Sequence, residues 1–217
     1  MWEDNQRQWL ISFANGRLYA AYSTNGTSAT SLDSGVTIST GQTYHFAFTR
    51  QGSTFSLFVD GVLKVTSTSS SALHSTTGAL HVGSNGDNLG SLEFHGYLDD
   101  LRVTKGTAIY TENFSVPIAA VGPTGTPITT SGGFEDLARN HGVTKAGDAA
   151  INSSVKKFGT SSLYLDGTGD YLTVSSGSEF KDFNSTEFTI EGWFYCTNDS
   201  SSSVSYTHLT LPTILLV

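Results

Sequence analysis

The chain has 217 residues, of which only 14% are charged, and a formal net charge of −8. This negative charge argues against nucleic acid and anionic membrane surfaces as partners, and it is compatible with neutral glycans and cations. The single cysteine, Cys196, excludes an internal disulfide, and no apolar run approaches the length that spans a bilayer. Frequent glycine, with 13 Phe and 9 Tyr, favours short strands joined by tight turns, so we expect an all-β fold without membrane insertion.

The first expected strands are joined by Asn-Gly turns. Strand-forming residues at 9–13 and 17–23 flank Asn15-Gly16, and Asn25-Gly26 follows the second of them. Asn-Gly between two apolar segments favours a two-residue hairpin, because both of its central positions adopt positive φ.

The next segment, residues 44–114, has the strongest strand signals of the chain. Tyr44, Phe46 and Phe48 recur at every second position and so share one face, and Asp60-Gly61 lies between two apolar runs. Strands recur every 8–12 residues or so up to Phe114, a spacing that is typical of a β-sandwich or jelly roll.

The composition changes after Phe114. Pro117, Pro123 and Pro127 lie close together with glycine, and proline withholds a hydrogen-bond donor, so we expect a linker at residues 119–132. Beyond it we expect a hairpin whose turn runs from Asp166 to Asp170, and a strand at 188–195.

The last residues, 204–217, have a different origin. They resemble the translation of a common transposase sequencing adapter, followed by three variable codons and a final Val217. We therefore treat this tail as an artefact of metagenomic sequencing and exclude it from the functional interpretation.

The remaining chain resembles the laminin-G-like branch of the concanavalin A-like lectin/glucanase superfamily, as found in tandem in phage tail fibres and bacterial surface proteins. The resemblance rests on motifs in family-like order, namely residues 44–50, 57–61, 81–83, 96–106, 108–111 and 114. It implies a concanavalin A-like antiparallel β-sandwich.

The resemblance also implies an unusual domain organisation. Residues 1–118 resemble the later two-thirds of one laminin-G-like domain, and residues 133–203 resemble the opening third of a second. Since missing strands leave open sheet edges, the second piece could complete the first, giving a circularly permuted sandwich. This hypothesis requires residues 188–195 to pair with the segment 9–114.

The sequence gives little support for catalysis. Glycoside hydrolysis needs two carboxyl groups in one site, but Glu191 has no partner at the expected spacing. Asp99 and Asp100 are adjacent on a strand and should point to opposite faces. We therefore expect no enzyme, and a glycosidase using Glu191 is the least favoured alternative.

Calcium is the expected cofactor, because Asp carboxylates and loop carbonyls are the hard oxygen ligands that it prefers. Laminin-G-like relatives often bind calcium, without fixing the ligands in this chain. The alternative is that these aspartates form turns or accept backbone hydrogen bonds. The candidate metal ligands are Asp87, Asp99, Asp100, Asp166 and Asp170.

Trp9 and Trp193 are the candidate binding residues, because tryptophan can stack on a sugar ring, although strand aromatics also form cores. The resemblance implies a non-catalytic module that binds a glycan or cell-surface protein beside neighbouring tandem domains. Its expected setting is a phage tail fibre or virion protein; a secreted bacterial adhesin or surface protein and a structural spacer are the alternatives. The expected location is the virion or the extracellular cell surface.

Overall fold

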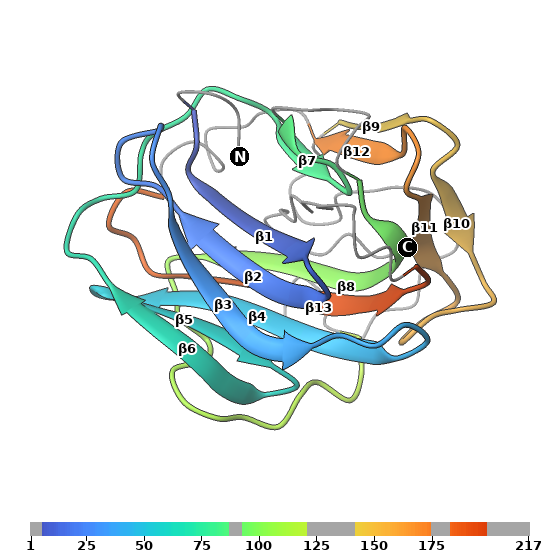
Figure 1. Ribbon diagram of the computed structural model, residues 1–217, viewed down its shortest axis with the longest axis horizontal. Coiled ribbons are helices and arrows are strands. Elements are labelled where there is room, and N and C mark those ends of the chain that lie inside the picture. Colours follow the sequence, from blue (N-terminus) through green and yellow to red (C-terminus); the bar gives the residue numbers. More distant parts are fainter. Residues whose placement is uncertain (1–5, 87–92, 121–141, 175–182, 199–217) are drawn as a thin grey trace.

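The computed structural model describes residues 6–86, 93–120, 142–174 and 183–198, in which thirteen β-strands form three antiparallel sheets (Figure 1). This confirms the all-β prediction. In chain order the strands are β1 (Trp9–Ala14), β2 (Arg17–Tyr22), β3 (Thr30–Thr37), β4 (Thr43–Gln51), β5 (Thr54–Val59), β6 (Val62–Thr68), β7 (Leu80–Val82), β8 (His95–Lys105), β9 (Val143–Ala146), β10 (Ala150–Asn152), β11 (Ser162–Asp166), β12 (Tyr171–Val174) and β13 (Phe188–Cys196).

Two of the hairpins predicted from local turn chemistry are present, whereas the turn with Asn25-Gly26 lies in a longer loop between Tyr22 and Thr30. Asn15 and Gly16 have φ values of 51° and 69° between β1 and β2. Asp60 and Gly61 have φ values of 49° and 75° between β5 and β6. Positive φ at both central positions is the backbone that matches the twist of a two-residue hairpin.

The seven-stranded sheet joins segments that lie far apart in the sequence. Its order is β10-β11-β8-β13-β4-β5-β6, so β13 lies between β8 and β4 (Figure 1). Its register with β4 runs from Phe188 opposite Arg50 to Tyr195 opposite Thr43. The ladder that the permutation hypothesis requires is therefore present. The assignment of residues 133–203 to a second domain copy stays a prediction, and most of the expected linker and the tail 204–217 lie outside the described residues.

The predicted hairpin around residues 166–170 is wrong. β11 pairs with β8 and β10, whereas β12 pairs with β7 and β9, so the turn connects two different sheets. Residues 166–170 do form a turn, as their local sequence predicts. The strands that β11 and β12 pair with, however, include β8 and β7, which come from distant parts of the chain. β11 instead pairs along one edge of β8, with Leu163 opposite Leu98.

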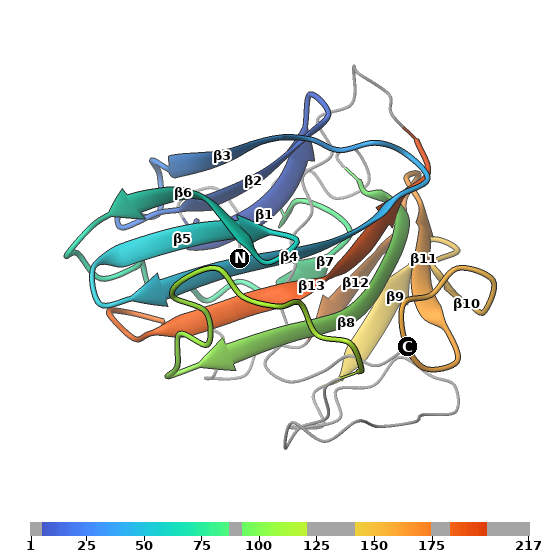
Figure 2. The same cartoon turned by 90° about the horizontal axis from the view of Figure 1, so that it is seen from below.

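One hydrophobic core lies between the seven-stranded sheet and the two smaller sheets, β1-β2-β3 and β7-β12-β9. Figure 2 shows β1, β2 and β3 as a separate layer over the strands of the large sheet. Alternation decides the inward face: Phe46, Phe48 and Phe194 are buried in this core. The result is the predicted concanavalin A-like β-sandwich.

The opposite face of the large sheet, here called the outer face, is partly covered by the segment 106–118. Ile109 donates a backbone hydrogen bond of 2.7 Å to Thr189 Oγ1, and Phe114 donates one of 2.9 Å to the Gly61 carbonyl. A side chain at Gly61 would collide with that Phe114 carbonyl, so glycine is needed there for packing as well as for the turn. In the described parts of the chain there is no helix with the length and apolar character needed to cross a membrane.

Candidate functional site

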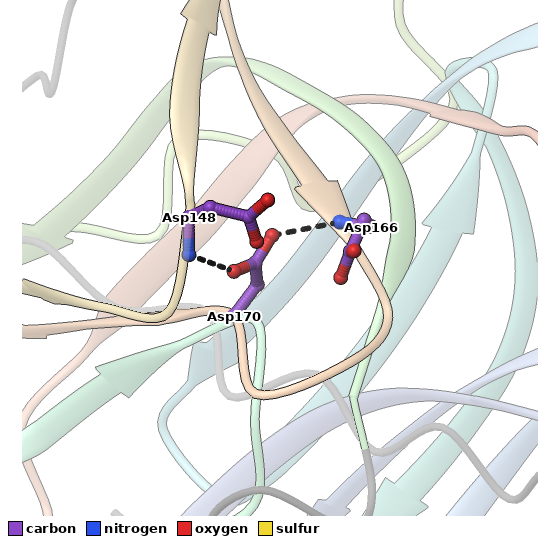
Figure 3. Close-up of side chains that lie close together, drawn as sticks. All are labelled: Asp148, Asp166 and Asp170. Carbon is purple, nitrogen blue, oxygen red and sulfur yellow. Dashed lines mark hydrogen bonds between the residues drawn. The ribbon is translucent and has the colours of Figure 1, made fainter.

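Three aspartates converge at one end of the large sheet and form what is here called the acidic cluster. Asp148 lies in the turn between β9 and β10, Asp166 ends β11, and Asp170 directly precedes β12 (Figure 3). A carboxylate oxygen from each lies within 4.8 Å of the others. Asp166 and Asp170 were predicted as metal ligands. Asp148 was not, because Gly147-Asp148 by itself indicates only an ordinary turn. Only the pairing of β9 with β12 brings it to the site.

Asp170 is fixed by hydrogen bonds from the backbone of both neighbours. Its two oxygens accept from the Asp148 amide at 2.8 Å and from the Asp166 amide at 2.9 Å (Figure 3). Its side chain is buried against Gly147, where a Cβ would collide with Asp170 Oδ1 and the Gly169 carbonyl. The Asp170 carboxylate therefore holds both loops in place. Each of its oxygens keeps a further lone pair that could bind a ligand.

Glu93 adds a fourth carboxyl group beside the acidic cluster. It accepts a hydrogen bond from the Gly169 amide, while its buried Oε1 atom has no partner among the described residues. Burial raises the pKa of Glu93, and the charges of Asp170 and Asp166 add to this, although the Gly169 amide opposes it. Burial is likewise the main cause that raises the pKa of Asp170. Such an excess of negative charge fits a divalent cation with hard oxygen ligands.

The other predicted metal ligands do not join this cluster. Asp99 Oδ2 accepts backbone hydrogen bonds from Lys157 at 2.5 Å and from Phe158 at 2.9 Å, so Asp99 holds a loop instead. Asp100 has a φ of 48° in a β-bulge where the register of β8 against β13 shifts. Asp99 therefore has a structural role, whereas the assignment of Asp100 as a metal ligand stays a prediction. Asp87 lies outside the described residues.

Neither predicted tryptophan offers a free ring face. Trp9 is 1% exposed and packs edge-on against Phe183 in the core, so its assignment as a sugar-stacking residue is corrected. Trp193 is 4% exposed on the outer face, and the Lys157 ammonium lies 4.0 Å from its ring centroid. The Trp193 ring is thus also covered, although Trp193 lines a shallow pocket together with Asp99.

Glu191 is the centre of a buried polar cluster beneath the segment 106–118. Arg102 donates from Nε and Nη2 to Glu191 Oε1, the Nε bond being 2.8 Å. Tyr110 donates its hydroxyl to Oε2 at 2.7 Å, and His45 Nε2 lies 3.3 Å from the same oxygen. This cluster fastens the segment 106–118 to the sheet.

Residues 2–108 match the family model described as the concanavalin A-like lectin/glucanases superfamily. This part of the chain belongs to that superfamily, on its laminin-G-like branch. Comparisons with curated proteins and with solved structures gave no match. Membership indicates carbohydrate or surface binding for the laminin-G-like domain, while the superfamily also includes glycosidases.

The environment of Glu191 does not suit a general acid. Burial by itself raises the pKa of Glu191, but the hydrogen bond with His45, the charge of Arg102 and the hydroxyl of Tyr110 outweigh it and hold the pKa below its ordinary value. A glycosidase acid needs a raised pKa and contact with the glycosidic oxygen. Glu191 is 3% exposed, with both oxygens engaged.

Asp99 should make folding of the laminin-G-like domain depend on pH in a particular direction. Burial raises the pKa of Asp99 from 3.8 to about 6, and the amides of Phe158 and Lys157 oppose this only in part. The folded protein therefore holds the proton more tightly than the unfolded chain, so the contribution is fully present below about pH 4 and is lost as pH rises through about 6. Relative to Asp99→Asn, the wild type should gain about 2–3 kcal/mol in free energy of unfolding between pH 7.5 and pH 4.

Urea denaturation of both proteins at the two pH values measures this gain. Because the two proteins are compared at the same pH, the contributions of their shared carboxyl groups to the free energy of unfolding cancel in the difference. Asp33→Asn, at an exposed position, is the control and should show almost no change with pH in the same comparison. A difference of the opposite sign, with Asp99→Asn more costly at pH 7.5 than at pH 4, would show that the backbone amides that donate to Asp99 outweigh its burial.

Proposed function

We propose that this protein is a non-catalytic module that binds a carbohydrate or a cell-surface receptor and holds calcium at its acidic cluster. The observation that supports it most directly is the convergence of Asp148, Asp166 and Asp170 at one end of the sandwich. These three carboxylates would hold the ion, and the buried Glu93 would add negative charge beside it. Bound calcium would neutralise the site and stiffen the two turns that contribute to it.

The proposed setting is a phage tail fibre or virion protein, located on the virion or at the extracellular cell surface. The order of the motifs between residues 44 and 114, which resembles tandem domains of such proteins, supports this setting. The neighbouring partners would be further copies of the same domain. The domains encoded beside this one in the parent gene test the setting, since a signal peptide or surface anchor would indicate a bacterial adhesin instead.

Calcium is expected to stabilise the folded protein at neutral pH. A ligand at 100 times its dissociation constant adds about 2.7 kcal/mol to the free energy of unfolding. Thermal unfolding of EDTA-treated protein, with and without added Ca²⁺, measures the shift. Asp148→Asn should remove most of this shift, because it takes away one of the three clustered carboxylates. Asp148 is exposed, and among the described residues no backbone amide donates to its side chain, so the substitution should leave the fold intact.

Glu112→Gln is the matched control, since it removes one exposed carboxylate outside the acidic cluster and should leave the calcium shift intact. An equal shift in wild type and Asp148→Asn would place the ion elsewhere. Binding of the calcium-loaded protein to a glycan array, lost with EDTA, tests recognition itself. Absence of binding to glycans and to host cell surfaces would favour a structural spacer.

A further inference from the structure

A row of tyrosines crosses the outer face of the large sheet. Tyr164 of β11, Tyr97 of β8 and Tyr195 of β13 occupy directly paired positions on adjacent strands. All three side chains are half-buried, and Tyr97 lies 4.9 Å from Tyr164 and 5.8 Å from Tyr195 between ring centroids. The planes of Tyr97 and Tyr164 differ by 38° and those of Tyr97 and Tyr195 by 75°, so the three rings pack against one another across the three strands.

This tyrosine row lies between two polar features on the same face. Asp166 of the acidic cluster is two residues after Tyr164 on β11, and Asp99 is two residues after Tyr97 on β8. Because alternate residues of a strand share a face, both carboxylates project from the same side of the sheet as the tyrosines. Trp193 pairs directly with Asp99 across the two strands, next to the row.

Asp99 and Trp193 each present a polar atom without a partner among the described residues. Asp99 Oδ1 and Trp193 Nε1 belong to side chains that are only 6% and 4% exposed. Both residues line one shallow pocket, which Tyr97, Tyr195 and Lys157 also border. Buried polar atoms are nearly always hydrogen-bonded to protein or water, so an unmatched acceptor and an unmatched donor on two paired residues suit a partner that both donates and accepts, either a water molecule or a ligand group. A hydroxyl has this complementarity, because it donates one hydrogen bond and accepts another.

We propose that the tyrosine row and this pocket together bind a pyranose ring of a neutral glycan. The apolar face of the sugar lies on Tyr97 and Tyr164, and one sugar hydroxyl enters the pocket, donating to Asp99 Oδ1 and accepting from Trp193 Nε1. Aromatic surface with a few convergent polar groups is the usual composition of a ligand site. This inference rests on the proposed function and assigns carbohydrate binding to a defined face.

The Lys157 side chain borders the pocket and lies over the Trp193 ring. It is exposed, and its ammonium lies 4.0 Å from the Trp193 ring centroid, so it can leave without disturbing the core. The backbone of the same residue remains bound to Asp99 Oδ2, which keeps the carboxylate oriented while the side chain moves. The ligand is neutral in this proposal because Asp99 and the acidic cluster place carboxylates on both sides of the row, where a charged sugar acid would be repelled.

The test uses the calcium-loaded full chain at pH 7.5 on an array of neutral and acidic oligosaccharides, followed by calorimetric titration with the best-bound oligosaccharide. Tyr97→Ala should weaken binding at least tenfold by removing the stacking surface. Asp99→Asn should do the same, since the amide keeps an oxygen for the Lys157 and Phe158 amides but can replace the free acceptor with a donor. Tyr19→Ala, at a half-buried tyrosine on the separate β1-β2-β3 sheet, is the matched control and should bind within twofold of wild type.

The outcomes separate this inference from the proposed function. Wild-type binding that is unaffected by both Tyr97→Ala and Asp99→Asn leaves carbohydrate recognition standing and overturns the assignment to this face. Wild-type binding confined to acidic oligosaccharides also overturns it, as does an equal loss in Tyr19→Ala. Absence of wild-type binding to any oligosaccharide overturns the inference and the carbohydrate part of the proposed function together. Thermal unfolding of each variant ensures that any loss is measured on folded protein.

Discussion

A chain ending at residue 118 is expected not to fold. It would lack β13, which supplies hydrogen bonds to both β4 and β8 in the middle of the large sheet, and the β11 strand on the other edge of β8. Loss of β13 also removes the core side chains Phe188, Ile190 and Phe194, and each large apolar side chain contributes about 1.5–3 kcal/mol when buried. The same truncation removes the core side chains Leu163, Leu165, Leu172 and Val174 of β11 and β12, so the total loss is of the same size as the whole stability of a natural domain, about 5–15 kcal/mol.

Circular dichroism and hydrogen exchange of the 1–118 fragment measure this outcome. Adding a separate fragment of residues 133–203 should restore protected amides in β4 and β8, because the ladders in which β13 takes part do not depend on a covalent connection. A fragment 1–118 that unfolds cooperatively by itself would show that the first segment is an independent domain, and would contradict the shared sheet.

Arg102→Met is expected to destabilise the protein by about 3–5 kcal/mol, because it leaves a buried carboxylate without its main counter-charge. Glu191 is 4% exposed at its side chain, whereas Arg102 is 17% exposed and can reach water. Glu191→Gln should therefore cost less than Arg102→Met, since the unpaired guanidinium that it leaves is partly solvated. Urea denaturation at pH 7.5 gives both values.

The exposed pair of Arg17 and Asp33, 3.0 Å apart, is the matched control for this buried pair. Asp33→Asn should change the free energy of unfolding by at most about 1 kcal/mol, as is usual for surface ion pairs. The pH dependence supplies a second check. Because the pKa of Glu191 is held down in the folded state, its stabilisation is present above about pH 4.3 and is lost at lower pH in wild type. Equal costs for the buried and exposed pairs would contradict the structural role of Glu191.

The tyrosines proposed to bind sugar on the outer face of the large sheet were not predicted from the sequence. The assignment of Trp9 and Trp193 rested on residue type, and the structure buries both. Tyr97, Tyr164 and Tyr195 have no common motif and lie up to 98 positions apart, from Tyr97 to Tyr195. Only the order β11-β8-β13 sets them side by side. A single sequence contains no local signal for such a row.

The sequence by itself determined the features that depend on neighbouring residues. Asn15-Gly16 and Asp60-Gly61 specified their hairpins because positive φ at two consecutive positions is a local property of those side chains. Alternation at Phe46 and Phe48 likewise indicated which face of β4 points into the core between the sheets. The tertiary structure alone decided which strands pair across long separations, and with them the partner of β11, the addition of Asp148 to the acidic cluster and the position of Asp99 beside Trp193. Their common physical reason is that strand pairing uses the same backbone hydrogen bonds everywhere, so the partner is chosen by packing of the whole core.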